Sequence, residues 1–197
     1  NHGSIVEING KWYVFYHRQT NKHQFSRQAC AEEIQIGADG SIKQVEMTSC
    51  GLNGGPLLGK GEYPAYIACN LMSRSGAVRY EFGYVIDKSH PYFTQEGEDR
   101  EDHPNQYIAN ITDGAIAGFK YFDFVDVSKI SVKVRGTGKG KLLVSTTLGG
   151  EEVAELAVSP GQDWGIFTAP LMISGVNTLF FTYKGEGSID LLSFTIE

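Results

Sequence analysis

The last third of the chain alternates apolar and polar residues with a period of two. Residues 130–135, for example, read Ile-Ser-Val-Lys-Val-Arg. This period gives a β-strand one face toward a core and one face toward water. Turn-forming glycines and prolines separate the successive runs, and short strands between such turns indicate a β-sandwich or barrel. The further strands expected in this region span residues 142–147, 153–158, 166–168, 178–183 and 189–196.

The first 48 residues predict a separate antiparallel meander. The Asn9-Gly10 pair is a strong hairpin signal, and Asp39-Gly40 marks a second turn. A four-stranded meander is typical of one propeller blade or of a small sheet. A sheet of this size cannot bury both of its faces alone, so we expect it to pack against neighbours. The strands expected here span residues 4–7, 11–17, 26–36 and 41–47.

Residues 51–61 separate the two patterns. They contain five glycines and one proline in eleven residues and show no periodicity, which is typical of a linker. The sequence therefore predicts an all-β protein with a blade at 1–50, a glycine-rich linker at 51–61 and a β-sandwich at 62–197.

Composition excludes several classes of partner. The formal net charge of −6 argues against nucleic acid, because phosphate binding requires a basic surface. No apolar run approaches the roughly 18–20 residues that span a bilayer, so we expect no membrane partner. The chain shows no signal peptide and begins at Asn1 rather than methionine, which suggests a processed or excised piece.

Two further features, the cysteines and an acidic segment, have ordinary structural explanations. The three cysteines, Cys30, Cys50 and Cys69, are too few for a disulfide framework, and we expect them to be reduced and partly buried. The acidic segment 95–104 could hold calcium through its carboxylates, but it lacks the spacing of an EF-hand loop. Charge runs of this kind are usually solvated loops.

Several segments resemble known carbohydrate-active proteins. Residues 1–7 (Asn-His-Gly-Ser-Ile-Val-Glu) and 10–18 (Gly-Lys-Trp-Tyr-Val-Phe-Tyr-His-Arg) resemble the last blade of glycoside hydrolase family 43, a five-bladed β-propeller family. Later segments resemble a family 6 carbohydrate-binding module, a jelly-roll-like, galactose-binding-domain-like sandwich. The resemblance to the blade extends to Arg27 and residues 39–42. The resemblance to the module is carried by residues 66–73, 113–114, 121–124, 163–164 and 185–194.

The resemblance implies the C-terminal portion of an enzyme that hydrolyses plant polysaccharides or oligosaccharides, such as a β-xylosidase or α-L-arabinofuranosidase. Family 43 enzymes invert configuration with two carboxylates, which stand roughly 6.5–9.5 Å apart in inverting glycosidases. In the family these carboxylates come from earlier blades, so we expect no catalytic residue in this chain and no activity from it alone. The acids of the first 50 residues, including Glu32, Glu33 and Asp39, lie on one blade without a partner across a cleft.

The same resemblance implies partners and a compartment. We expect a xylan or arabinoxylan ligand, contact with the missing propeller blades or a second copy of the chain, and a secreted or periplasmic location. Two alternatives stay open. The chain could be a stand-alone carbohydrate-binding module, or its sandwich could only support the propeller.

Two residues match the centre of the family's propeller. His2 resembles a histidine that reaches the propeller axis near a bound metal or water cluster, so its link to a metal would be indirect. Arg27 resembles an arginine of the substrate pocket, where a guanidinium fork pairs with carboxylates and sugar hydroxyls. Both could instead be ordinary surface residues, His2 near a frayed terminus.

Sugar binding requires an aromatic face for the pyranose ring and neighbouring groups that pair with hydroxyls. In family 6 modules a cleft among the loops holds two aromatic residues and an asparagine. Trp164 matches the loop tryptophan of that cleft, and Phe119 or Tyr121 could be the second ring. All three could equally be packing residues. Ser188 stands where the family has asparagine, which weakens the expectation of affinity at this cleft.

The family also holds a structural calcium ion with a Glu-Ala-Glu triplet on its first strand. Here the matching positions read Ala68-Cys69-Asn70, or Ile67-Ala68-Cys69 in the other register. Asp190 remains as a candidate ligand, but calcium prefers several carboxylate oxygens. We therefore expect no required cofactor and no tightly held calcium.

Overall fold

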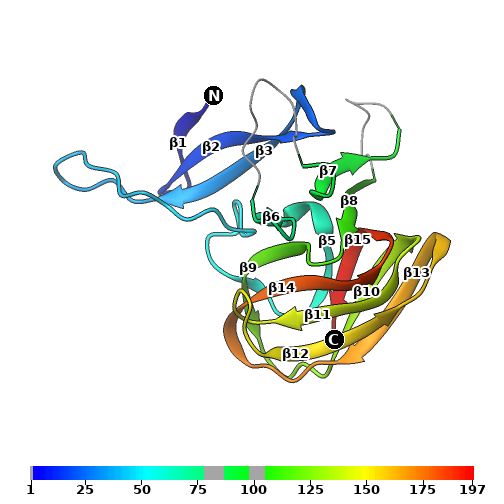
Figure 1. The fold of residues 1–197 in the computed structure, drawn as a ribbon. Coiled ribbons are helices and arrows are strands. Elements are labelled where there is room, and N and C mark those ends of the chain that lie inside the picture. Colours follow the sequence, from blue (N-terminus) through cyan, green and yellow to red (C-terminus); the bar gives the residue numbers. More distant parts are fainter. Residues whose placement is uncertain (1, 78–86, 98–104) are drawn as a thin grey trace.

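The computed structural model describes residues 2–77, 87–97 and 105–197, which form three antiparallel-rich sheets and one short 3-10 turn. Figure 1 shows a small sheet from the first third of the chain beside a sandwich formed by the rest. The described residues contain no helix that is long and apolar enough to cross a membrane. The predicted all-β class is confirmed.

The small sheet, which we call the blade sheet, has the order β1-β2-β3. It consists of β1 (Ser4–Ile8), β2 (Lys11–Thr20) and β3 (His23–Ile34). Asn9 and Gly10 join the first two strands with φ values of 51° and 79°, the left-handed conformation that tight hairpins need. Asn21 and Lys22 repeat this geometry in the second hairpin, with φ values of 55° and 52°.

The expected fourth strand at residues 41–47 does not form, so the predicted four-stranded blade has three strands. After β3 the chain makes a loop closed by the Gly37 N–H to Ser41 carbonyl bond at 2.8 Å and by one isolated bridge between Ile36 and Ile42. The reason lies further along the segment, where Glu46 pairs with Lys120 of the sandwich at 2.7 Å. The Ser49 N–H also donates to the Lys120 carbonyl at 2.5 Å, and Thr48 bonds to the side chain of Glu32, so the backbone here pairs with β9 rather than forming a ladder with β3.

Two six-stranded sheets form the sandwich. Sheet I has the order β13-β10-β15-β8-β7, with β5 also pairing β15, and sheet II has the order β12-β11-β14-β9-β4, with β6 also pairing β9. The strands of sheet I are β5 (Gly61–Pro64), β7 (Tyr92–Gln95), β8 (Gln106–Thr112), β10 (Lys129–Gly136), β13 (Gly161–Pro170) and β15 (Ser188–Ile196). Those of sheet II are β4 (Leu57–Leu58), β6 (Asn70–Met72), β9 (Ile116–Phe124), β11 (Lys139–Ser145), β12 (Glu152–Val158) and β14 (Gly175–Glu186).

The core lies between sheets I and II. Phe119, Phe122, Phe181 and Phe194 are fully buried there, and the Phe119 and Phe194 rings meet edge to face with centroids 4.7 Å apart. Such pairs add to the stabilisation that burial provides. A Cβ atom at Gly118 would stand 2.7 Å from the Phe180 ring, so glycine is required for this close approach.

The second half of the predicted linker pairs with the sandwich. Leu57 of β4 lies opposite Phe122 in a parallel pairing, and the Gly59 N–H donates to the Asp123 carbonyl at 2.7 Å. The 3-10 turn (Ala65–Ile67) then leads into β6. The boundaries at 50 and 62 stay predictions, but residues 57–61 contact the sandwich directly.

Candidate functional site

Arg18 of β2 joins the blade sheet to the sandwich. Its guanidinium lies 3.6 Å from the centre of the Phe93 ring on β7, and it donates to the carbonyls of Tyr66 and Ala68. Its Nε also donates to the Gln28 side chain on β3 at 2.9 Å. Burial lowers the pKa of Arg18, so these partners must offset the cost of removing its charge from water.

Glu32 of β3 is the second attachment of the blade sheet. It is only 6% exposed, and its carboxylate accepts bonds from the Thr48 N–H and hydroxyl, both at 2.7 Å, and from the Tyr16 hydroxyl at 3.0 Å. Burial and the Glu32 charge raise the pKa of Tyr16. A buried carboxylate with three donors is well satisfied, so Glu32 serves to fix the chain after β3.

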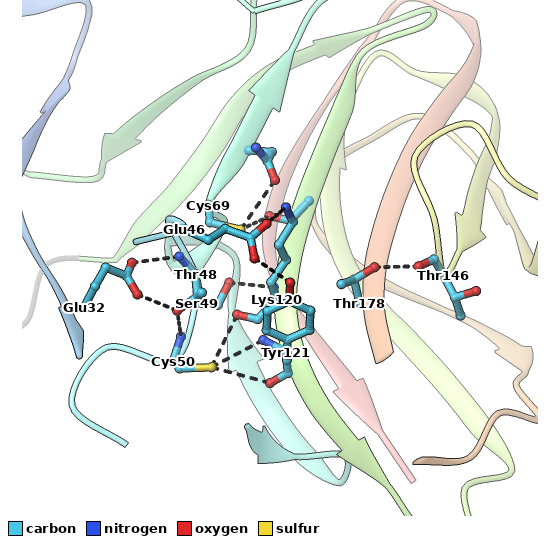
Figure 2. A network of polar contacts seen from close by, with 12 residues as sticks. Glu32, Glu46, Thr48, Ser49, Cys50, Cys69, Lys120, Tyr121, Thr146 and Thr178 are labelled. Carbon is cyan, nitrogen blue, oxygen red and sulfur yellow. Dashed lines mark hydrogen bonds and ion pairs between the residues drawn. The ribbon is translucent and has the colours of Figure 1, made fainter. Parts of the chain in front are cut away.

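Residues 46–50, which we call the strap, carry this network onto β9 (Figure 2). The Lys120 N–H donates to the Ser49 hydroxyl at 3.1 Å, and the Tyr121 N–H points to the Cys50 sulfur at 3.4 Å. The Tyr121 hydroxyl donates to Glu46 at 2.5 Å. That hydrogen bond raises the pKa of Tyr121 to about 12. Cys30, Cys50 and Cys69 are all free thiols, as expected.

The blade sheet, the strap and the 3-10 turn meet in a contact region that we call the seam. A hollow of about 330 Å³ lies there. Apolar side chains dominate its lining, and they include Phe15, Ala31, Met47, Leu52 and Ile67. The polar side chains beside it are already paired, because Arg18 and Tyr16 make the bonds described above. This hollow therefore offers an apolar surface rather than a set of unpaired polar groups.

The propeller-centre candidates lie on the blade sheet beside a second hollow, which shares Phe15, Tyr16 and Ala29 with the first. His2 is exposed and lines a hollow of about 370 Å³ with Phe15, His17 and Ala29. Arg27 is exposed on β3, two residues from Ala29 and therefore on the same face of the sheet. The described residues include no group of three or more histidine, cysteine or acidic side chains that could hold a metal ion. The metal link of His2 stays a prediction.

Trp164 belongs to a cluster on the outer face of sheet I. Its ring lies edge to face with Tyr107 of β8, with centroids 5.4 Å apart. The Arg135 guanidinium of β10 lies 4.2 Å from the Trp164 ring centre and 4.9 Å from that of Tyr107. Arg135 also pairs with Glu96 at 2.5 Å and with Asp190 at 3.4 Å.

The structure does not bring the expected sugar-site residues together. Trp164 lies within β13 rather than in a loop, and Ser188 begins β15, where its N–H donates to the Thr137 hydroxyl at 3.3 Å. Phe119 is fully buried in the core, so it cannot stack on a sugar. Tyr121 is on sheet II and its hydroxyl is engaged by Glu46 in the seam.

Asp190 has protein partners that differ from those of a calcium ligand. It accepts a bond from the Asn110 N–H at 3.1 Å and pairs with the Arg135 Nε. A neighbouring guanidinium repels a divalent cation, and residues 68–70 supply no carboxylate. Of the acidic segment 95–104, residues 98–104 lie outside the described residues.

Arg135 and Tyr107 are site residues that the sequence did not single out, and Glu96 was considered only as part of the acidic segment 95–104. The alternation of residues 130–135 does place Arg135 on the polar face of its strand. The sequence pattern could not predict its neighbours, because only the strand order of sheet I brings these distant segments together. A groove of about 410 Å³ adjoins the cluster along the same face, because Lys133 lies opposite Ser193 and Arg135 lies opposite Asp190. Its polar lining residues are Glu62, Asn105, Gln106, Lys133 and Ser193.

Comparison with known proteins gives a clear relative. No family model matches the chain. A protein named xylosidase/arabinosidase from Thermoclostridium stercorarium is 50% identical over 198 residues, which cover 100% of this chain. The chain spans only 42% of the length of that relative.

Solved structures share the fold. A glycoside hydrolase family 43 arabinoxylan arabinofuranohydrolase from Bacillus subtilis, solved with cellotetraose, matches 99% of this chain and 40% of its own, with 20% identity and a TM-score of 0.61. A family 6 carbohydrate-binding module from Clostridium stercorarium, solved with cellobiose, matches 73% of this chain and 98% of its own, with 13% identity and a TM-score of 0.57. A β-1,3-glucan-binding family 6 module from Bacillus halodurans matches 73% and 99%, with 18% identity and a TM-score of 0.56. The expected fold, a propeller-blade segment followed by a family 6-like sandwich, is confirmed.

Proposed function

Because the chain shares its fold with part of a family 43 glycoside hydrolase and with family 6 modules, we propose that it is the C-terminal portion of a glycoside hydrolase. The whole enzyme would act on xylan- or arabinoxylan-type chains. The observation that carries this proposal is the 50% identity to a xylosidase/arabinosidase across the entire chain. Because its substrates would be polymers, we also propose a secreted or periplasmic location.

In this proposal the chain supplies a blade and its support, while the catalytic carboxylates lie elsewhere in the enzyme. Glu32 is committed to Thr48 and Tyr16, and Glu33 pairs with Lys11 at 2.9 Å. Asp39 accepts the Ser41 N–H at 3.0 Å, and hydrogen bonds from Ser41 lower its pKa. An acid whose pKa is lowered is a poor proton donor at neutral pH.

The blade sheet presents its other face to the remaining blades. Phe15, His17 and Ala29 line the hollow beside His2 there, and Val6 of β1, which lies opposite Tyr13 on the same face, is 41% exposed. Apolar residues gathered on one open face suggest an interface. The other blades of the same enzyme are the occupant we propose, and a second copy of the chain is the alternative.

A chimera tests this function. The chain replaces the matching segment of the Thermoclostridium stercorarium relative, and hydrolysis of aryl xyloside, aryl arabinofuranoside and arabinoxylan is compared with that of the unaltered relative. We expect an active chimera and no turnover by the chain alone. A folded chimera without activity on any of these substrates would contradict the proposal, as would hydrolysis by the isolated chain.

A second role, direct binding of glycan, is supported by the outer face of sheet I. Trp164 and Tyr107 lie there beside a polar groove that includes Asn105 and Gln106, and amides with aromatic rings are the groups that sugars require. Affinity electrophoresis with xylan and arabinoxylan tests this role. We expect retardation of the chain that is lost in Trp164→Ala and kept in Trp12→Phe.

A further inference from the structure

We propose that Arg135 is the positioning residue of a glycan-binding site on sheet I. In this assignment Arg135 supports one face of the Trp164 indole, so that the opposite face receives the pyranose ring of an uncharged oligosaccharide. The inference rests on the glycan-binding role proposed above and identifies the residue that controls it.

The strands of sheet I supply the cluster one residue at a time. In the order of the sheet, β13 gives Trp164, β10 gives Arg135, β15 gives Asp190 and β8 gives Tyr107, while Glu96 directly follows β7. Trp164 and Tyr107 are 57 positions apart in the sequence, yet their rings meet at 5.4 Å. Arg135 lies close to both rings and therefore fixes them relative to each other.

Arg135 itself has little freedom to move. Its Nη1 and Nε bond to Glu96 and Asp190, and its side chain is only 23% exposed. Asp190 is in turn held by the Asn110 N–H at 3.1 Å. A guanidinium is planar and delocalised, so it can stack on an aromatic face while its edge donates to carboxylates. The indole is thus supported by a rigid group rather than by solvent.

The position of Arg135 determines which face of the Trp164 indole is left for a ligand. Arg135 approaches from the neighbouring strand β10, and β13 is the edge strand of sheet I. Trp164 is partly exposed and Arg135 covers one face of its ring, so in this assignment the opposite face is the one offered to a ligand. An edge tryptophan without this support would lose rotamer freedom on binding, at a cost that a fixed ring avoids.

The charges of the cluster identify the class of ligand. Glu96 and Asp190 both pair with Arg135, so the cluster holds two carboxylates against one guanidinium, and this excess of negative charge disfavours an anionic sugar. In the adjoining groove, Glu62 accepts the Ser193 hydroxyl at 2.7 Å, and Asn105 and Gln106 offer amides. Amides and hydroxyls suit the hydroxyl groups of a neutral chain such as a xylo- or cello-oligosaccharide.

The test uses the full chain in a Trp12→Phe background, which leaves Trp164 as the single tryptophan. Arg135→Met keeps an apolar stem but removes the guanidinium, and Arg135→Lys keeps the charge without the planar fork. Xylohexaose and cellohexaose are titrated by indole fluorescence, and the near-ultraviolet circular dichroism of Trp164 is recorded without sugar. We expect Arg135→Met to weaken binding about tenfold and to reduce the Trp164 signal, with Arg135→Lys in between.

The outcomes separate this inference from the proposed function. Loss of binding in Trp164→Ala with unchanged or tighter binding in Arg135→Met would overturn the role of Arg135 and leave glycan binding intact. If the parent chain binds neither sugar, both proposals fail. If Arg135→Met does not fold, Glu96→Gln is used instead, because it weakens the partly exposed ion pair that holds Arg135. An unchanged Trp164 circular dichroism signal and an unchanged sugar affinity in Glu96→Gln would contradict the assignment.

Discussion

Tyr121 shows how a single partner changes what a residue can do. From the sequence it was a candidate sugar platform, but its hydroxyl donates to Glu46, 75 residues earlier in the chain. Lys120 pairs with the same carboxylate at 2.7 Å. The hydrogen bonds from Lys120 and Tyr121 lower the pKa of Glu46, and the bond to Glu46 raises the pKa of Tyr121 to about 12. The side chain is therefore committed to holding the strap.

This pair predicts a change in an alkaline titration. Glu46→Gln removes the negative charge beside the phenol, so we expect the pKa of Tyr121 to fall from about 12 toward its ordinary value of 10.0. Ultraviolet absorbance measured against pH follows the phenolate, and the difference from Tyr121→Phe isolates this residue from the other tyrosines. An unchanged titration curve in Glu46→Gln would show that the hydrogen bond does not form.

The same shifts have opposite consequences for stability. Folding raises the pKa of Tyr121, so its contribution to stability is complete below pH 10 and is lost as pH rises through about 12. Folding lowers the pKa of Glu46, so its contribution is present above the ordinary value of 4.5 and is lost as pH falls. We therefore expect the strap to contribute most to stability between pH 4.5 and pH 10.

At the scale of elements, the seam depends on Arg18. Replacing it with alanine removes the stacking on Phe93 and leaves the carbonyls of Tyr66 and Ala68 without their donor. An unsatisfied buried polar group costs about 1–3 kcal/mol. We expect Arg18→Ala to lower the free energy of unfolding by about 3 kcal/mol, measured by urea denaturation.

Matched substitutions make this measurement specific. Lys43→Ala removes an exposed cation from the loop after β3 and should change stability by less than about 0.5 kcal/mol. Arg18→Lys keeps the charge but cannot bond two carbonyls with a planar fork, so it should recover only part of the loss. Equal stability of Arg18→Ala and Lys43→Ala would contradict the role assigned to Arg18.

Element prediction from the sequence succeeded where one face of a strand is buried. Alternation in residues 130–135 placed Ile130, Val132 and Val134 toward the core, and all three are buried. It failed at residues 41–47, because a partner outside the local sequence captured Glu46. Trp164 could not be placed correctly for the same reason, since its neighbours Arg135 and Tyr107 come from strands that only the sheet order brings together.

At the scale of the whole molecule, the core is distributed unequally. Among residues 2–56, only Tyr13, Ala31 and Ile34 are buried apolar residues, while the large cluster of the sandwich lies entirely between Ala65 and Ile196. The blade sheet is held by Arg18, Glu32 and the strap rather than by a core of its own. An isolated sheet of three strands with so few buried side chains is marginal in water.

This inequality predicts different behaviour of the two parts when they are separated. Residues 57–197 keep β4 and the whole core, so this fragment should fold and melt cooperatively. Its melting temperature should be lower than that of the full chain, because Cys50 and Glu46 no longer cover β9. Residues 1–56 should be unfolded by circular dichroism and by amide exchange. A cooperative melt of 1–56, or an unfolded 57–197, would contradict this dependence.

If this dependence holds, the blade sheet is ordered only because the sandwich holds it. Deleting the sandwich from the active chimera should then abolish hydrolysis, even though the deleted part contains no catalytic carboxylate in our proposal.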